Sequence, residues 1–237
     1  MRTNDQSSNA PAARRRRIGI AMAVAMLCVA YLAPARKPLA NTDEYRAAHG
    51  IVHGRVNEIR VKGLLFRFPA AYLPEPETSD GIVRGQADTV RLHADLSFLL
   101  VPAPEFRSEA YGLVRIEIRA QGFEDVRRKQ ERLAGHGWES TRERPDLGMR
   151  EYIEHGDSGG WGYRAYASDD PRWRTPRGGP IVFDCAGMRG SEPSQCRAAY
   201  QHPRGPLIVY YLSWNLLPRW REAHREVVGR VDSFILE

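Results

Sequence analysis

The stretch PLIVYYLSW, Pro206–Trp214, decides the fold because it is the most strongly strand-like segment of the 237-residue chain. Its β-branched and aromatic residues are typical of a strand buried in a sheet. The segment that follows, Leu217–Ile235, places apolar residues three or four positions apart, which predicts a helix with one buried stripe. The two segments together predict a sheet on which a C-terminal helix packs.

Upstream segments predict further strands and one further helix. Apolar and charged residues alternate in 113–120, LVRIEIRA, as in a half-buried strand. Residues 123–133 have helical spacing, and two short apolar runs around a Gly-rich stretch predict a hairpin over 152–167. Runs of strands followed by a helix predict the α+β class, with an antiparallel sheet covered by helices on one face. The repeated order is also open to interpretation as two similar halves, 41–140 and 146–237.

The first 35 residues have the order of an export signal. Arg14–Arg17 precede an apolar run at residues 18–32, and small residues follow it. At 1.5 Å per residue the run measures roughly 22 Å, which is shorter than the ~30 Å hydrocarbon core of a bilayer. We therefore expect residues 1–35 to be a cleaved signal peptide, or else an inner-membrane anchor. In both cases residues 36–237 form an exported domain in the periplasm.

Two of the three cysteines, Cys185 and Cys196, are separated by ten residues. In an oxidising compartment this pair predicts a disulfide, which stabilises a loop of this size by roughly 2–3 kcal/mol in the chain-entropy model. Free thiols and a metal site are the alternatives. Zinc would need two more ligands at fixed spacing, and neither a CxxC motif nor a close pair of histidines lies near. We expect no metal and no cofactor.

The net charge of +6 does not predict nucleic-acid binding. Five arginines and one aspartate give the first 35 residues a net charge of +4, which leaves only +2 for the rest of the chain. The basic character therefore belongs mostly to the targeting segment rather than to a phosphate-binding face.

The motif GDSGG at Gly156–Gly160 matches the nucleophile loop of chymotrypsin-like serine proteases, in which a histidine acts as the base. His49 would have to be that base, but it lies too close to the expected mature start for the strands that precede it in such enzymes. We therefore interpret the motif as a Gly-rich hairpin turn. Ser158 remains the candidate nucleophile of an alternative function, a secreted hydrolase.

A segment after this motif is rich in the residue types that dominate protein–protein interfaces. Its tryptophans, tyrosines and arginines are interrupted by glycines and prolines, which are typical of exposed loops. The predicted binding surface consists of Trp161, Tyr163, Arg164, Tyr166, Arg172, Trp173 and Arg174.

The C-terminal half resembles immunity proteins that are exported by bacteria and encoded beside type VI secretion effectors. The resemblance covers about 50 residues: the cysteine pair, the strand LIVYYLSW, and a helix that contains LLPRW and VDSFI. It implies a protein partner, a toxin such as a lipase effector, and carries no functional residue over. The sequence therefore predicts a non-enzymatic, exported immunity protein. The alternatives are the hydrolase and a membrane-anchored component of the envelope or of a secretion apparatus.

Overall fold

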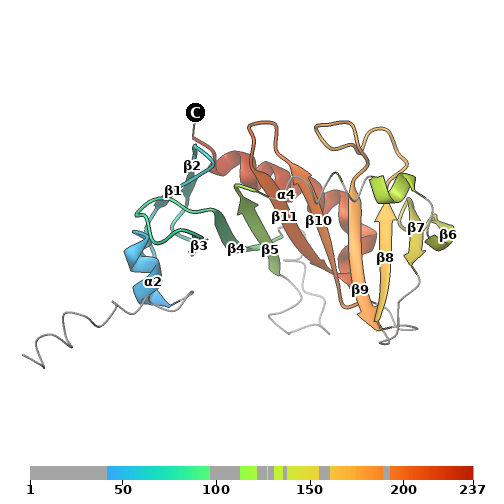
Figure 1. The fold of residues 1–237 in the computed structure, drawn as a ribbon, viewed down its shortest axis with the longest axis horizontal. Helices are drawn as coiled ribbons and strands as arrows, with labels where there is room; N and C mark the ends of the chain where they lie inside the picture. The colour runs from blue at the N-terminus through green and yellow to red at the C-terminus, as the bar shows by residue number, and fades with distance from the viewer. Residues whose placement is uncertain are drawn as a thin grey trace, which may run out of the picture. The chain divides into compact units, whose positions relative to one another are not determined.

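Strand β11 (Leu207–Ser213) lies inside a nine-stranded sheet, between β5 (Leu113–Arg119) and β10 (Gln195–Gln201) (Figure 1). The described strands follow the order β3-β4-β5-β11-β10-β9-β8-β7-β6, and each neighbouring pair is antiparallel. The remaining strands are β3 (Glu75–Glu77), β4 (Thr89–Asp95), β6 (Trp138–Arg144), β7 (Met149–Glu154), β8 (Trp161–Ala167) and β9 (Val182–Met188).

This computed structural model describes residues 42–96, 113–121, 127, 131–135, 138–154, 161–188 and 193–236. The chain divides into two units, Met1–Leu39 and Ala40–Glu237, and the described residues belong to the second. The predicted signal peptide or anchor lies outside the described residues. In the part of the chain that is described, no helix has both the length and the apolar character needed to span a bilayer.

A short helix and a two-stranded sheet precede the large sheet. Helix α2 (Asp43–Ala48) is followed by the hairpin of β1 (Asn57–Val61) and β2 (Leu64–Phe68). Lys62 and Gly63 join the two strands with positive φ angles of 51° and 82°. This backbone conformation is the one that matches a two-residue hairpin turn to the twist of its strands.

Helix α4 (Trp220–Phe234) follows a 3₁₀ helix, η2 (Trp214–Arg219), and covers one face of the sheet. Its buried side chains recur at spacings of three and four, which places them on a single stripe. They are Trp220, Ala223, Val227, Val231 and Phe234. The stripe reaches from Phe183 of β9, whose ring lies 5.9 Å from Trp220, to Phe68 of β2, whose ring lies 5.3 Å from Phe234. The C-terminal helix therefore packs on the sheet and on the β1–β2 hairpin.

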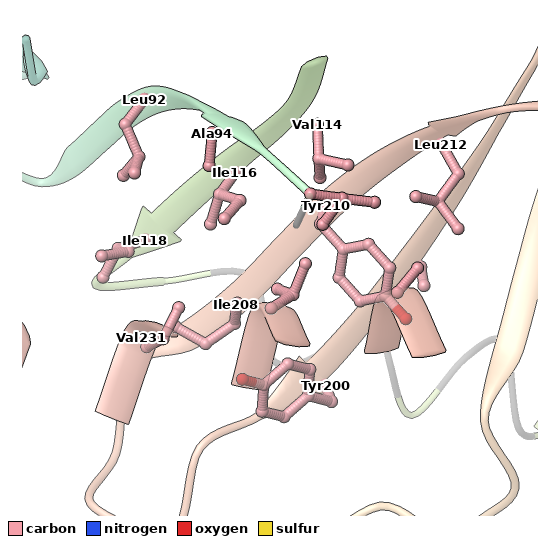
Figure 2. Packing of buried hydrophobic residues seen from close by; sticks show 14 of the residues in the cluster. Leu92, Ala94, Val114, Ile116, Ile118, Tyr200, Ile208, Tyr210, Leu212 and Val231 are labelled. Atoms are coloured by element: carbon pink, nitrogen blue, oxygen red, sulfur yellow. The ribbon is translucent and has the colours of Figure 1, made fainter. Parts of the chain in front are cut away.

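The strand register explains why the face under α4 is apolar. Tyr210 of β11 pairs with Ile116 of β5, and Ile208 pairs with Ile118, so that alternate residues of neighbouring strands meet on one face. Figure 2 shows these side chains gathered on the same side as Val231 of α4. All five side chains are fully buried. The core of the domain therefore lies between this face and α4.

The predicted α+β class is wrong, because the described chain is predominantly β. The nine-stranded sheet and the β1–β2 hairpin hold most of the described residues that belong to helices and strands, and α4 is the longest helix among those described. The sequence predicts no element for the polar stretch Trp138–Arg144, which forms strand β6 at the edge of the sheet and adds to the excess of strand. The hypothesis of two similar halves stays a prediction.

Candidate functional site

The seven residues of the predicted binding surface do not share one face of the structure. Tyr163 of β8 lies on the sheet face opposite α4, whereas Arg164 and Tyr166 of the same strand lie on the α4 face. Trp161 begins β8, but its side chain is not among those described. Successive residues of a strand point to opposite faces, so neighbours in this part of the sequence are separated in space. The other three residues belong to the loop between β8 and β9.

Tyr166 is fully buried and belongs to a charged cluster on the α4 face. Its hydroxyl donates a hydrogen bond of 2.6 Å to Oε1 of Glu151, a fully buried residue of β7. Arg142 of β6 donates from Nε to the other carboxylate oxygen. Nitrogens of Arg164 and Arg144 lie 3.7 Å and 3.9 Å from the carboxylate. We call these five residues the Glu151 cluster.

Glu151 stays ionised at neutral pH despite its burial. Burial raises the pKa of this carboxyl group, but hydrogen bonds from Arg142 and Tyr166, together with the nearby arginine charges, outweigh the effect and lower the pKa below its usual value. Burial and the hydrogen bond to Glu151 raise the pKa of Tyr166, which keeps its hydroxyl protonated as a donor. The cluster is therefore a fixed ionic network rather than a proton-transferring pair.

Tyr163 belongs to an aromatic group on the opposite face of the sheet. Its ring stacks at 6.4 Å on Trp138 of β6, and the guanidinium of Arg132 lies 5.1 Å from the same ring. Its hydroxyl donates to Asp184 of β9. Burial raises the pKa of Tyr163, so the phenol stays neutral. These contacts hold Tyr163 within the domain and leave it partly exposed.

A second group of partly buried charges lies on this same face and was missed from the sequence. Glu117 of β5, whose side chain is 3% exposed, lies among three arginines. Nε of Arg91 and Nε of Arg115 are 3.4 Å and 3.5 Å from its Oε1, and Arg119 binds its Oε2. Arg115 also stacks at 3.7 Å over the ring of Tyr211. We call these five residues the Glu117 cluster.

The loop between β8 and β9 is anchored to α4 by Trp173. The Trp173 ring lies 5.1 Å from Trp220 and 6.2 Å from His224, both in an edge-on arrangement. Burial lowers the pKa of His224 to about 4, so its ring is neutral at physiological pH and packs as an aromatic group. Its Nδ1 lies 2.8 Å from the hydroxyl of Tyr210. The loop is therefore held over the α4 face by ring contacts.

Six arginines belong to the two segments that meet at this contact. The β8–β9 loop contributes Arg172, Arg174 and Arg177, which are exposed, while η2 and α4 contribute exposed Arg219 and Arg225 and half-buried Arg221. Two of them are neutralised: Arg172 by Asp170 at 2.7 Å, and Arg219 by Glu222. Hydrogen bonds from Arg172 lower the pKa of Asp170 to about 2. We call the six arginines and Trp173 the Trp173 arginine surface.

The predicted binding surface shares Arg172, Trp173 and Arg174 with this group, and it did not include Arg177 or the arginines of η2 and α4. Arg221 and Arg225 are four residues apart, so they lie on the same side of α4. That spacing was available in the sequence, but only the apolar stripe of the helix was considered.

The predicted disulfide is confirmed. Cys185 of β9 and Cys196 of β10 are directly opposite in the register, with their Cα atoms 4.1 Å apart, and their sulfurs are bonded. Both residues are fully buried. The bond therefore joins two neighbouring strands of the sheet, next to β11.

The candidate nucleophile, Ser158, lies outside the described residues, together with the loop that carries it. Within the described residues there is no group of three or more histidines, cysteines and carboxylates arranged to hold a metal ion. His202, which is buried, places its Nε2 2.7 Å from Asp232, and its Nδ1 accepts a hydrogen bond from the backbone of Arg204. That pair links a turn to α4.

No protein-family model matches the chain, and no curated protein is similar to it. One solved structure is similar: an immunity protein of the type IV secretion system of Stenotrophomonas maltophilia. The TM-score is 0.50 at 10% sequence identity, and the match covers 78% of this chain and 94% of the other. At this identity the likeness shows a shared fold.

Proposed function

We propose that this protein is an exported immunity protein, which binds a toxin acting in the periplasm and so protects the cell that makes it. The observation that carries the proposal is the fold, shared over 78% of the chain with an immunity protein of a secretion system. Immunity by binding needs a stable surface rather than catalytic groups. The ionic networks and ring contacts described above supply rigid charged and aromatic surfaces of that kind.

The disulfide supports the exported location. Disulfides persist in oxidising compartments such as the periplasm and are rare in the cytosol. The Cys185–Cys196 bond therefore agrees with the export signal expected at residues 1–35. Whether that segment is cleaved or stays in the inner membrane decides only how the domain is held in the periplasm.

The two likenesses point to different classes of toxin. The sequence resembles immunity proteins for type VI effectors such as lipases, whereas the similar structure serves a type IV system. A protein toxin is the partner that both likenesses share, and a lipase effector is one member of that class.

Affinity purification of the tagged full chain from its native envelope tests the proposal. We expect a stoichiometric partner whose toxicity, when it is directed to the periplasm, is suppressed by co-expression of this protein. The same sample gives the mature N-terminus, which separates cleavage after residue 35 from anchoring. The proposal fails if the partner is not toxic, or if repeated purifications under conditions that induce secretion systems give none.

A Ser158→Ala variant separates binding from hydrolysis. An immunity protein that works by occlusion keeps full protection when this hydroxyl is removed, because no bond is cleaved. A hydrolase that uses Ser158 as its nucleophile loses its activity. A matched Ser194→Ala variant, at an exposed serine before β10, controls for the loss of a serine hydroxyl.

A further inference from the structure

Four arginines of the Trp173 arginine surface form no close ion pair with a carboxylate among the described residues. Arg172 and Arg219 are paired with carboxylates. By contrast, Arg174, Arg177, Arg221 and Arg225 form no ion pair within 4 Å with a described carboxylate, although the charges of Arg221 and Arg225 help to lower the pKa values of Asp170 and Glu222. They come from a loop and a helix that are far apart in the sequence. Because Trp173 packs on Trp220, the loop and the helix that carry these arginines meet at this tryptophan.

The loop that carries these cations is held in place by its own backbone. Thr175 donates to the carbonyl of Gly179 at 2.7 Å, and Gly178 donates to that of Thr175 at 2.8 Å. The backbone N–H of Trp173 donates to the carbonyl of Asp170 at 3.0 Å. Together with the packing of Trp173 on Trp220, these bonds fix the backbone positions from which the side chains of the loop arginines extend.

The helix cations are also positioned before any partner arrives. Arg225 lies 5.6 Å from the ring of Trp173, and Arg221 lies 4.8 Å from the ring of Trp220. Arg221 passes close to Gly148 in the β6–β7 turn, where a Cβ atom would come within 2.1 Å of Nη2. Gly148 has φ 62°, so the turn both needs glycine and leaves room for the guanidinium. Such preorganisation reduces the entropy lost on binding.

We propose that the Trp173 arginine surface is the site that recognises the partner, and that it binds an acidic patch on the toxin. This inference rests on the proposed function, since it names the surface and chemistry of the same interaction. Guanidinium groups bind carboxylates through two parallel hydrogen bonds, which gives geometric specificity as well as charge attraction. Arginine and tryptophan are also the residues that most often dominate interface energies.

The composition of the surface favours a protein over a membrane or a nucleic acid. Asp170 and Glu222 are interspersed among the arginines, and they would repel a continuous array of phosphates. A protein partner can place carboxylates opposite the arginines and basic or neutral groups opposite Asp170 and Glu222. Membrane insertion would need exposed apolar side chains, and the large exposed ones among the described residues are Val52, Val56 and Val83, outside this surface.

Binding to a defined acidic probe tests the inference directly. The probe is a poly-L-glutamate peptide, and its affinity for the full exported domain is measured at about 50 mM and about 500 mM NaCl. We expect the triple variant Arg174→Glu, Arg177→Glu, Arg225→Glu to bind the peptide about tenfold or more weakly at low salt. The matched control reverses three exposed arginines elsewhere, Arg55→Glu, Arg60→Glu, Arg84→Glu, and should change the affinity about twofold or less.

Thermal unfolding of both triple variants checks that the domain remains folded. If either variant is unfolded, the same three arginines are replaced by Gln instead of Glu. Equal loss of peptide affinity in the two triple variants overturns the inference, because net charge alone would then explain binding. Tighter binding of phosphatidylglycerol vesicles or duplex DNA than of the peptide also overturns it.

The purification from the envelope keeps the two proposals distinct. A toxin captured equally by the wild type and by the Arg174, Arg177, Arg225 variant supports the proposed function and refutes this surface. Loss of the toxin in that variant, with capture retained in the Arg55, Arg60, Arg84 control, supports both. Absence of any toxin with the wild type refutes the proposed function, while the peptide assay still decides whether the surface selects acidic protein.

Discussion

Glu117 and Glu151 are buried on opposite faces of the same sheet, and each lies within 4 Å of three arginines. The two glutamates differ in where their partners come from. Arg115 and Arg119 lie two residues on either side of Glu117 in β5, and Arg91 faces it from β4. The arginines that meet Glu117 therefore come from two neighbouring strands, β4 and β5, and Tyr211 of β11 contacts only Arg115.

The Glu151 cluster joins three strands. Arg142 comes from β6, and Tyr166 and Arg164 come from β8, on either side of Glu151 in β7. The ring of Tyr166 in turn packs at 5.4 Å on Trp214 of η2. A buried carboxylate is costly unless it is paired and hydrogen-bonded. The stability of Glu151 in its buried position therefore depends on groups from three strands. Strands β6, β7 and β8 are therefore joined by an ionic network in addition to their backbone pairing.

Glu151→Gln should give the largest effect, because it keeps the shape of the side chain and leaves three guanidinium groups without their shared buried charge. We expect the free energy of unfolding to fall by about 3 kcal/mol or more. Glu117→Gln should cost about 1–2 kcal/mol, because Arg91 keeps its ion pair with Glu77.

Urea unfolding at neutral pH measures both changes as shifts of the midpoint at constant slope. Equal losses for the two variants would contradict the distinction between a glutamate whose charged partners come from three strands and one whose charged partners come from two. A lower slope for Glu151→Gln alone would instead show that the β6–β8 edge has separated from the cooperative unit.

The sequence predicted the strands and bonds whose signals are apolar or covalent. The segment Pro206–Trp214, the hairpin over 152–167 and the Cys185–Cys196 pair carried such signals, and all three are present as β11, as β7 with β8, and as the disulfide. Helix α4 begins at Trp220, slightly after the predicted start at Leu217, because η2 occupies the residues around Pro218.

The fold class could not be predicted because an edge strand can be polar. Residues 138–144, WESTRER, lack an apolar period, and five of these seven side chains are exposed in β6. Charged residues on an edge strand hinder pairing with other chains, so the feature that hides the strand from sequence reasoning has its own physical purpose.

The predicted binding surface stays a prediction, and its residues are divided for a geometric reason. Arg172, Trp173 and Arg174 lie together because a loop keeps neighbours in sequence close in space. Tyr163 and Arg164 lie on opposite faces because they are neighbours in a strand. Glu151 reads in the sequence as one more solvated charge, and only the register of β6, β7 and β8 shows that it points to the face shared with the core.

Tyr166→Phe should give an intermediate effect. The hydroxyl donates a 2.6 Å hydrogen bond to Glu151, and its loss leaves a buried charge with one donor fewer, which we expect to cost about 1–2 kcal/mol. Tyr211→Phe is the matched change in the Glu117 cluster. Its ring, rather than its hydroxyl, carries the contact with Arg115, so the cost should stay within about 0.5 kcal/mol. Thermal and urea unfolding of the two variants provide the measurement, and a larger loss for Tyr211→Phe would refute the assigned roles.

Acid should give the smallest effect, because only the proton-linked part of the Glu151 cluster responds to pH. The network lowers the pKa of Glu151 in the folded state below the value of 4.5 expected for an unfolded chain. In acid the unfolded chain therefore takes up this proton first, and the stability that the carboxylate contributes is fully present above about pH 4.5 and is lost as the pH falls through the folded pKa.

The stability difference between wild type and Glu151→Gln should therefore be constant from pH 7 to about pH 5.5 and shrink below about pH 4.5. Urea unfolding of both proteins across this range gives the difference directly, and groups outside the cluster cancel because they are common to both. A difference that grew in acid would mean that burial, rather than Arg142 and Tyr166, sets the pKa of Glu151. In that case the cluster would strain the edge of the sheet instead of joining its three strands.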